Sequence, residues 1–233
     1  GWDNFIKAAS YDKILVCSCA TDHSMEGKTV QAIADERGIP APDAILDIML
    51  SERAEVTIVI DSQSVSDNRR IIAHELSMIG SDSLPSSFSG RLAYGKPHPR
   101  CFGTFPRVLG HFVREEGLLT LEKAIWKMSG FPAQRFGLAD RGMIKAGLIG
   151  DFVIFDPATV GGSADYVNPR QAPTGIDYVI KNGVVVVENG HRLLGEDRAI
   201  VDLERGDVHR APGHLHAVVE GVAHRVPPLE RRQ

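Results

Sequence analysis

The chain has 233 residues, enough for one large domain or two modest ones, and its contents of 43% hydrophobic and 24% charged residues are those of ordinary globular proteins. A formal net charge of −4 argues against nucleic acid or an anionic membrane as a partner. No apolar run approaches the roughly 20 residues that span a bilayer, and three cysteines do not make a disulfide framework, so we expect a cytoplasmic protein.

The first eighty residues are predicted to alternate strands with helices. Apolar and β-branched runs predict buried strands at 13–19 (KILVCSC), 56–60 (VTIVI) and 76–79 (LSMI). Helical spacing of apolar residues predicts helices at 28–37, 44–50 and 68–75, of which 44–50 is apolar enough to be largely buried. Apolar strands separated by helices predict an α/β fold with a parallel sheet covered on both faces.

Asp82 follows the third predicted strand directly. Because parallel sheets bind ligands beyond the carboxyl ends of their strands, this position favours a functional carboxylate. The alternative is a carboxylate that only caps a turn or a helix. The surrounding segment, 76–107, is long, irregular and contains four Pro and four Gly. Such loops in compact domains are usually functional or disordered, so we prefer the functional interpretation.

Cys17, Cys19 and His23 have a spacing that could suit a metal ion. Strand alternation would place the two cysteines on one face, with the histidine in the loop beyond. No fourth ligand follows at a recognisable spacing, and free cysteines are among the most buried residues. We therefore interpret them as core cysteines beside a loop histidine.

The second half of the chain is predicted to change from helices to antiparallel strands. Helices are expected at 108–115, at 121–128 after the cap Thr120, and at 133–136. A strand at 152–155 precedes a hairpin, 178–181 and 184–188, whose Asn182-Gly183 turn is the favoured type I′. We divide the chain into residues 1–137, 138–193 and a tail, 194–233. His214 and His216 in the tail could ligate a metal, but no regular element supports them and we favour a solvated tail.

Two stretches resemble the C-terminal part of the N-acyl-D-amino-acid deacylases (D-aminoacylases), in the metal-dependent amidohydrolase superfamily. The first is IGSDSLP with GKPHPRCFGTFPRVLGHFVREEGLLTLEKAIWKMSGFPAQRFGL, and the second is RGMIKAGLIGDFVIFDPATV with NPRQAPTGIDYVIKNGVVVVENG. Together they cover about half of the chain. The superfamily signature RGxIxxGxxAD matches loosely, with Gly150 where Ala is usual. The run HPRCFGTFPRVLG is what resembles the D-aminoacylase branch.

The resemblance implies a TIM-like (β/α)8 barrel with a small β-sandwich, of which this chain would supply about the last three barrel strands (within 1–137) and part of the sandwich (138–193). It also implies a zinc-activated water, and hydrolysis of N-acyl-D-amino acids to a carboxylate and a D-amino acid. Asp82 matches the aspartate that shuttles the proton, and Arg100 matches the arginine that grips the substrate's α-carboxylate. Ser83 stands where a small pocket residue is usual, and Lys96 and His98 flank the arginine and would position the loop.

The family's zinc ligands, histidines and a cysteine on earlier strands, find no match here, so we assign no metal ligand to this chain. The chain begins at Gly1 and not at Met. We expect a C-terminal portion of a longer enzyme, or a chain that takes its missing strands from a second chain, and no activity from it alone. Three strands cannot close a barrel. A serine- and glycine-rich insertion between Asp82 and His98 is expected to act as a lid over the acyl group.

Two rival functions remain open. One is another amidohydrolase that acts on cyclic amides, similar to dihydroorotases and hydantoinases, which would not need the HPR run. The other is a non-catalytic scaffold made from part of a barrel. Substitution of Asp82 separates catalysis from a scaffold role, because a scaffold would not respond to it.

Overall fold

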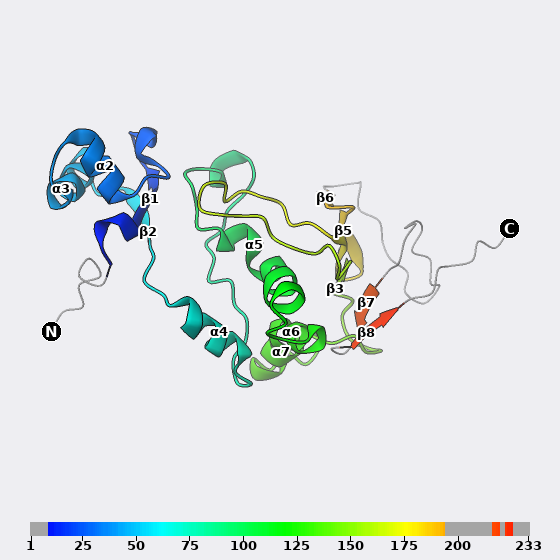
Figure 1. Ribbon diagram of the computed structural model, residues 1–233. Helices are drawn as coiled ribbons and strands as arrows, with labels where there is room; N and C mark the ends of the chain where they lie inside the picture. The colour runs from blue at the N-terminus through cyan, green and yellow to red at the C-terminus, as the bar shows by residue number, and fades with distance from the viewer. Residues whose placement is uncertain (1–8, 194–215, 220–221, 226–233) are drawn as a thin grey trace. The chain divides into compact units, whose positions relative to one another are not determined.

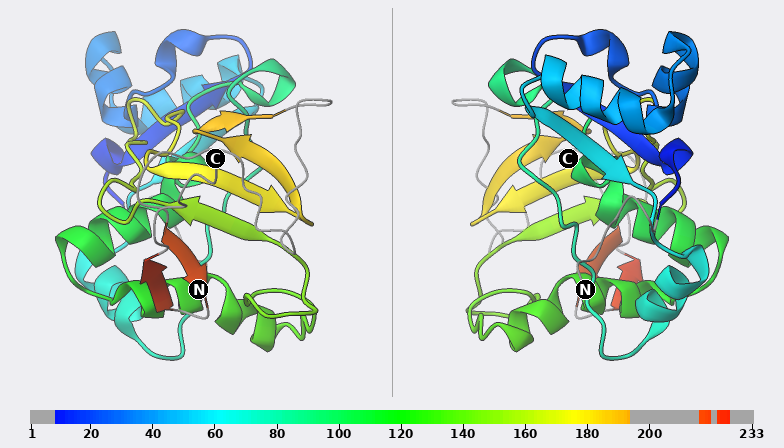
Figure 2. Two further views of the ribbon diagram at one scale, coloured as in Figure 1. Left: turned by 90° about the vertical axis from the view of Figure 1, so that its right-hand side faces the viewer. Right: turned by 90° about the vertical axis from the view of Figure 1, so that its left-hand side faces the viewer.

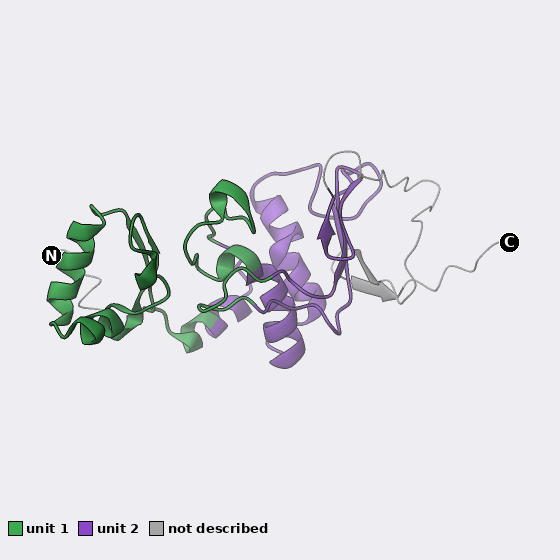
Figure 3. Ribbon diagram, turned by 90° about the horizontal axis from the view of Figure 1, so that it is seen from above, with its two compact units in different colours: residues 1–68, 82–102, 164–171 green, residues 69–81, 103–163, 172–233 purple. Residues whose placement is uncertain are grey.

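The computed structural model describes residues 9–193, 216–219 and 222–225, the last two ranges as backbone only. The chain forms two compact units (Figure 3). Unit 1 comprises residues 1–68, 82–102 and 164–171, and unit 2 comprises residues 69–81, 103–163 and 172–233. In the described ranges, no helix has the length and apolar content needed to cross a membrane.

The helices and strands of the described residues follow in chain order (Figure 1). They are η1 (Tyr11–Lys13), β1 (Ile14–Cys19), η2 (His23–Met25), α2 (Val30–Arg37), α3 (Ala41–Ser51), β2 (Val56–Ile60), α4 (Val65–Ala73), η3 (Gly90–Leu92), α5 (Arg100–Arg107), the π-helix η4 (Val108–Glu115), α6 (Leu121–Met128), α7 (Gly130–Arg135), β3 (Phe152–Phe155), β4 (Ile176–Lys181), β5 (Val184–Glu188), β6 (His191–Arg192), β7 (His216–Val219) and β8 (Val222–Arg225).

Unit 1 contains a two-stranded sheet, β1–β2, with the helices α2 and α3 packed on it. The strands lie close to their predicted bounds, but they pair antiparallel, with Ile14 opposite Ile60 and Cys19 opposite Val56. The prediction of a parallel sheet was therefore wrong for this chain. A parallel pair has slanted and slightly weaker hydrogen bonds and occurs mainly inside larger covered sheets, and β1 and β2 have no further described strand beside them.

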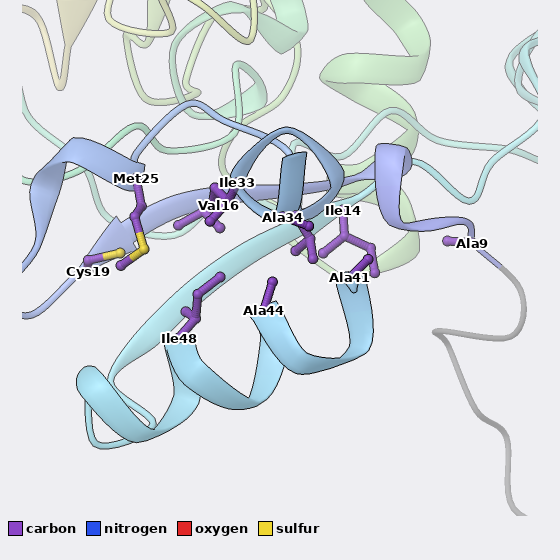
Figure 4. Packing of buried hydrophobic residues seen from close by; sticks show 11 residues of the cluster. Ala9, Ile14, Val16, Cys19, Met25, Ile33, Ala34, Ala41, Ala44 and Ile48 are labelled. Carbon is purple, nitrogen blue, oxygen red and sulfur yellow. The ribbon is translucent and has the colours of Figure 1, made fainter. Parts of the chain in front are cut away.

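The core of unit 1 lies between this sheet and the two helices (Figure 4). Val16, Ile33 and Ile48 are 0–3% exposed and meet there. The helix α3 is not largely buried, as its composition predicted, because Leu46 and Leu50 on its other side are 61% and 78% exposed. A single helix packed against one layer buries one stripe of its surface, whatever residues occupy the rest.

The third predicted strand, residues 76–79, is absent from the described structure, which is the second correction to the barrel prediction. α4 ends at Ala73 and the chain turns, so that Leu76 is 72% exposed. Ile79 packs against the core cluster of unit 2 and donates its backbone N–H to the Lys127 carbonyl at 3.1 Å. An apolar run becomes a strand only where another strand's edge is available, and this run finds a helix instead.

Unit 2 combines α6, α7 and η4 with a sheet whose strand order is β6-β5-β4-β3-β7-β8 (Figure 2). The predicted hairpin is confirmed: β4 and β5 pair antiparallel, and Asn182 and Gly183 have φ of 51° and 76°, the left-handed values that a type I′ turn requires. The predicted cap of α6 is confirmed as well, since the Thr120 hydroxyl accepts the Lys123 N–H at 3.3 Å.

Helix α5 begins at Arg100, inside the segment that was predicted to be irregular. Pro106 occupies its last turn and has no N–H to donate, which breaks the regular hydrogen-bond ladder. The wider π-helix η4 follows directly, and the Glu116 N–H at its end donates to the His111 carbonyl five residues back, at 2.9 Å. The prediction of an irregular segment was wrong here, because its Gly and Pro content disfavours a helix in the sequence pattern.

Candidate functional site

Asp82 and Arg100, the two residues predicted to act on the substrate, form an ion pair in unit 1. Arg100 Nη1 lies 2.9 Å from Asp82 Oδ2. The side chains are 85% and 41% exposed for Asp82 and Arg100, respectively. Pairs this exposed contribute about 0–1 kcal/mol to stability. The contact therefore brings the two predicted site residues together and contributes little to stability.

The backbone at Asp82 and the position of Arg100 are both uncommon. Asp82 has a φ of +47°, in the left-handed region that Asp tolerates better than most residues. Arg100 is the first residue of α5, where the positive end of the helix dipole disfavours a cation. The N–H groups of Arg100, Cys101 and Phe102 already have acceptors at residues 98 and 99, so the guanidinium and the helix dipole are what attract an anion such as a carboxylate to this end.

His98 connects this site to a distant part of the chain. Its Nδ1 accepts the backbone N–H of Arg100 at 3.0 Å, so the proton of the neutral ring is on Nε2. That nitrogen lies 3.1 Å from the Tyr166 hydroxyl and donates to it. Burial, together with the nearby Arg100 charge, lowers the pKa of His98 below its ordinary value of 6.5, although Asp82 opposes the shift. The neutral ring thus holds the first turn of α5.

Lys96 connects the loop to β1 through its backbone. Its backbone N–H donates to the Cys17 carbonyl at 2.5 Å. Its side chain covers Gly27, where an added Cβ would lie 2.7 Å from the Lys96 Nζ. Ser83, the expected pocket residue, is exposed beside Asp82 in the sequence.

Sequence reasoning missed Arg170, which binds the same loop from far along the chain. Its guanidinium donates to the Ser87 carbonyl at 3.2 Å, to the Gly95 carbonyl at 2.7 Å and to the Tyr94 carbonyl. Tyr166 was missed as well. Both belong to residues 164–171, and no local pattern marks side chains whose partners are 68 to 83 residues away.

The described residues do not fit a zinc ion. Among them, no group of three or more His, Cys, Asp or Glu side chains is arranged to hold a metal. A bulge at Cys17 interrupts the strand alternation that was expected to place it on one face with Cys19. Burial raises the pKa of each thiol to about 11, which keeps both protonated, and His23 pairs with Glu26 at 2.9 Å. His214 lies outside the described residues, and of His216 only the strand backbone is described.

A cavity of about 600 Å³ lies within unit 2. Its walls are mainly apolar and include Phe105, Trp126 and Met143. The five predicted site residues belong to unit 1, and none of them lines this cavity. The volume of this cavity therefore does not identify the predicted site.

Comparison with known proteins identifies the family. The model described as "Amidohydrolase family" matches residues 7–187. The chain is 40% identical over 174 residues to a D-aminoacylase of Alcaligenes xylosoxydans xylosoxydans, a match that covers 75% of this chain and 34% of the relative. It is 38% identical over 180 residues to an N-acyl-D-glutamate deacylase of the same organism, covering 77% of this chain and 34% of the relative.

Solved structures agree. The crystal structure of N-acyl-D-glutamate deacylase from Bordetella bronchiseptica, complexed with zinc and a phosphonate inhibitor, matches with a TM-score of 0.69 and 33% identity, over 78% of this chain and 36% of that one. A D-aminoacylase crystal structure matches with a TM-score of 0.67 and 38% identity, over 77% and 35%. The chain spans about a third of the length of these relatives. It belongs to the amidohydrolase family.

Proposed function

We propose that this chain supplies the proton-transfer and carboxylate-binding residues of a zinc-dependent hydrolase that cleaves the amide bond of N-acyl-D-amino acids. The observation that carries the proposal is the 2.9 Å contact between Asp82 and Arg100, which are 18 positions apart in a loop-rich segment. A group that moves protons and a group that binds a carboxylate must lie within one substrate's length of each other, and here they do.

Asp82 is the proton-transfer group in this proposal. Its carboxylate is 85% exposed, so it is open to a water molecule and a leaving amine. It takes a proton from the attacking water and gives one to the departing nitrogen, as a positioned carboxylate can. The left-handed backbone at Asp82 fixes the direction from which the carboxylate is presented.

Arg100 is the substrate anchor. A planar guanidinium binds a carboxylate through two parallel hydrogen bonds, and the N-terminal turn of α5 adds to the attraction. In the chain as described, the guanidinium is bound to Asp82, so a substrate carboxylate would replace that contact. Ser83 would line the pocket, while Lys96 and His98 position the anchor.

The zinc ion would be held by residues outside those described here, either elsewhere in a longer protein or on a second chain. In that assembly, residues 1–137 would belong to a TIM-like barrel and residues 138–193 to a β-sandwich. The barrel would require β1, β2 and residues 76–79 to pair in parallel with strands supplied from elsewhere, which differs from the antiparallel β1–β2 pair of the chain as described. The relatives' greater length supports this arrangement. We also propose a cytoplasmic setting, because Cys17, Cys19 and Cys101 are all free.

Asp82→Asn in the complete zinc-loaded enzyme tests the proposal. The amide keeps the size of the side chain but cannot take up the proton, so kcat for N-acetyl-D-methionine should fall by about 10²–10⁴-fold. Asp47→Asn is the matched control, because Asp47 is an exposed aspartate on the helix α3, away from the strand ends; it should change kcat by less than about twofold. Undiminished turnover in Asp82→Asn would favour the scaffold role, and turnover of cyclic amides in place of acylated amino acids would favour the rival hydrolase.

A further inference from the structure

A short downstream segment, residues 164–171, belongs to unit 1 because it packs on the loop that precedes α5. Asp165 shapes this segment, since its Oδ1 accepts the N–H groups of Val167 at 2.8 Å and of Asn168 at 2.6 Å. Pro169 is buried. The turn presents two side chains, Tyr166 and Arg170, to a loop about seventy residues earlier in the chain.

Arg170 holds that loop at both ends of its inserted part. Its three nitrogens donate to the carbonyls of Ser87, Tyr94 and Gly95. A guanidinium holds its N–H donors in a rigid planar arrangement. Its bonds to three carbonyls therefore fix the relative positions of the chain segments that carry them. The only described helical turn in residues 84–98 is η3, so the loop depends on contacts from outside it for its shape.

Gly95 is fixed from its other side as well. An added Cβ there would lie 2.4 Å from the Ser18 Cβ and 2.7 Å from the Cys17 carbonyl oxygen. The next residue, Lys96, donates its N–H to that same carbonyl. Arg170 therefore helps to hold Gly95 and Lys96 against β1, and these two residues come just before His98 and Arg100 in the sequence.

The second side chain of residues 164–171, Tyr166, contacts His98. The Tyr166 hydroxyl bonds to His98 Nε2, and the rings meet edge to face with centroids 5.1 Å apart. His98 Nδ1 in turn accepts the Arg100 N–H. The position of the Arg100 backbone is thus set by two side chains of residues 164–171, one acting through the loop and one through an imidazole.

We infer that Arg170, assisted by Tyr166, is a positioning residue that holds Arg100 where it binds the substrate's carboxylate. The inference deepens the proposed function and rests on it for the identity of the bound group. The geometric part, that Arg170 orders residues 84–98 and the start of α5, stands on the contacts alone. The two parts need separate measurements.

The first measurement is hydrogen exchange on this purified chain, which needs no catalysis. In Arg170→Gln, the amides of the loop that are hydrogen-bonded to backbone carbonyls, those of Ser87, Ala93 and Lys96, should exchange at least about tenfold faster than in the parent chain, while those of the β4–β5 hairpin in unit 2 stay unchanged. Arg91→Gln is the matched control, because Arg91 is an exposed arginine of the same loop; it should leave exchange unchanged. Exchange of the Ser87, Ala93 and Lys96 amides at the parent rate in Arg170→Gln would overturn the inference.

If Arg170→Gln speeds exchange throughout the chain, the variant is destabilised as a whole, and Tyr166→Phe tests the inference in its place. This variant keeps the ring and removes only the hydroxyl that bonds to His98. The Arg100 amide, followed by NMR, should then exchange faster by about threefold or more, with the rest of the chain unaffected. An unchanged Arg100 amide would contradict the inference.

The second measurement uses the complete enzyme and a double-mutant cycle. Arg170→Gln should raise KM for an N-acyl-D-amino acid about tenfold and change kcat less than about threefold. In an Arg100→Gln background the same substitution should have almost no further effect on KM, because Arg170 acts through Arg100. A general loss of structure would instead lower kcat in both backgrounds. If the parent enzyme does not hydrolyse these substrates, the proposed function fails, and the exchange experiment still decides whether Arg170 positions the loop.

Discussion

Arg100 carries its charge at the first residue of α5, where the helix dipole makes a cation unfavourable by about 0.3–1 kcal/mol. Its partner Asp82 is 85% exposed, so the ion pair offsets little of that cost. In the proposed function, a substrate carboxylate that binds at the same spot is attracted by the helix end and by the guanidinium together.

His98 should make the site sensitive to acid. Its pKa is lowered by burial and by Arg100, against the attraction of Asp82, and Tyr166 faces its other nitrogen. The unfolded chain therefore takes up a proton near 6.5 that the folded chain still resists. The stability that neutral His98 contributes is present above pH 6.5 and is lost as the pH falls from there toward the lowered pKa of the folded state.

An NMR titration checks this expectation. The His98 ring should titrate with a midpoint below 6.5, and exchange of the Arg100 amide should quicken as the ring becomes protonated, because a protonated Nδ1 cannot accept that N–H. His98→Asn is the control, since its side-chain oxygen offers an acceptor that does not titrate in this range. A His98 midpoint above 6.5 would contradict the assignment of a neutral, buried ring.

At the scale of single residues, the sequence marked Asp82 and Arg100 as candidate site residues, which stay predictions, and it did not mark Arg170. The first two stand in runs whose residue types are distinctive when read together, and the structure brings them into contact. Arg170 binds three backbone carbonyls, and any residue supplies a carbonyl. No sequence pattern therefore marks its partners, and only folding shows them.

At the scale of elements, local signals predicted what local physics controls. The Asn182-Gly183 turn and the Thr120 cap each depend on a few neighbouring residues, and both are present as expected. Strand pairing depends on which edges are available. The predictions of a parallel β1–β2 pair and of a strand at 76–79 were wrong for that reason. An apolar run does not determine which other strand, if any, lies beside it.

Lys127 of α6 provides a test of how residues 74–77 are held in place of that strand. It is 1% exposed, and its Nζ donates to the His74 carbonyl and, at 2.9 Å each, to the Ser77 carbonyl and hydroxyl. In Lys127→Met the His74 carbonyl keeps the Ser77 N–H at 3.1 Å, but the Ser77 carbonyl loses its ammonium donor. This loss should lower the free energy of unfolding by about 1–3 kcal/mol.

Urea unfolding followed by tryptophan fluorescence measures the loss, since Trp126 lies on the same helix. Lys123→Met is the matched control, because Lys123 is an exposed lysine of α6 and its replacement should change stability by less than about 0.5 kcal/mol. Equal stabilities of the two variants would show that the buried ammonium does not hold this turn.

At the scale of the whole molecule, the sheet of unit 1 has only the two described strands β1 and β2, and the barrel of the proposed function would need more strands to cover it. A two-stranded sheet is marginal by itself, and β1–β2 is supported by helices on the face that holds the core. Ile58 of β2 and Leu50 of α3 remain 45% and 78% exposed. In the proposed function, such apolar groups would be covered by the rest of a longer protein or by a second chain.

If the proposed function holds, the 233-residue chain alone should not hydrolyse N-acetyl-D-methionine when zinc is added, because the zinc ligands that this function needs find no match in its sequence. Supplying in trans the part of the relatives' length that this chain does not span should restore turnover, as the two pieces would complete one barrel and bring Asp82 to the metal's side. The same mixture made with Asp82→Asn should stay inactive, which separates repair of the fold from repair of the chemistry. Hydrolysis by the unaided chain would mean that it holds its own zinc and that Asp82 works beside ligands drawn from this sequence.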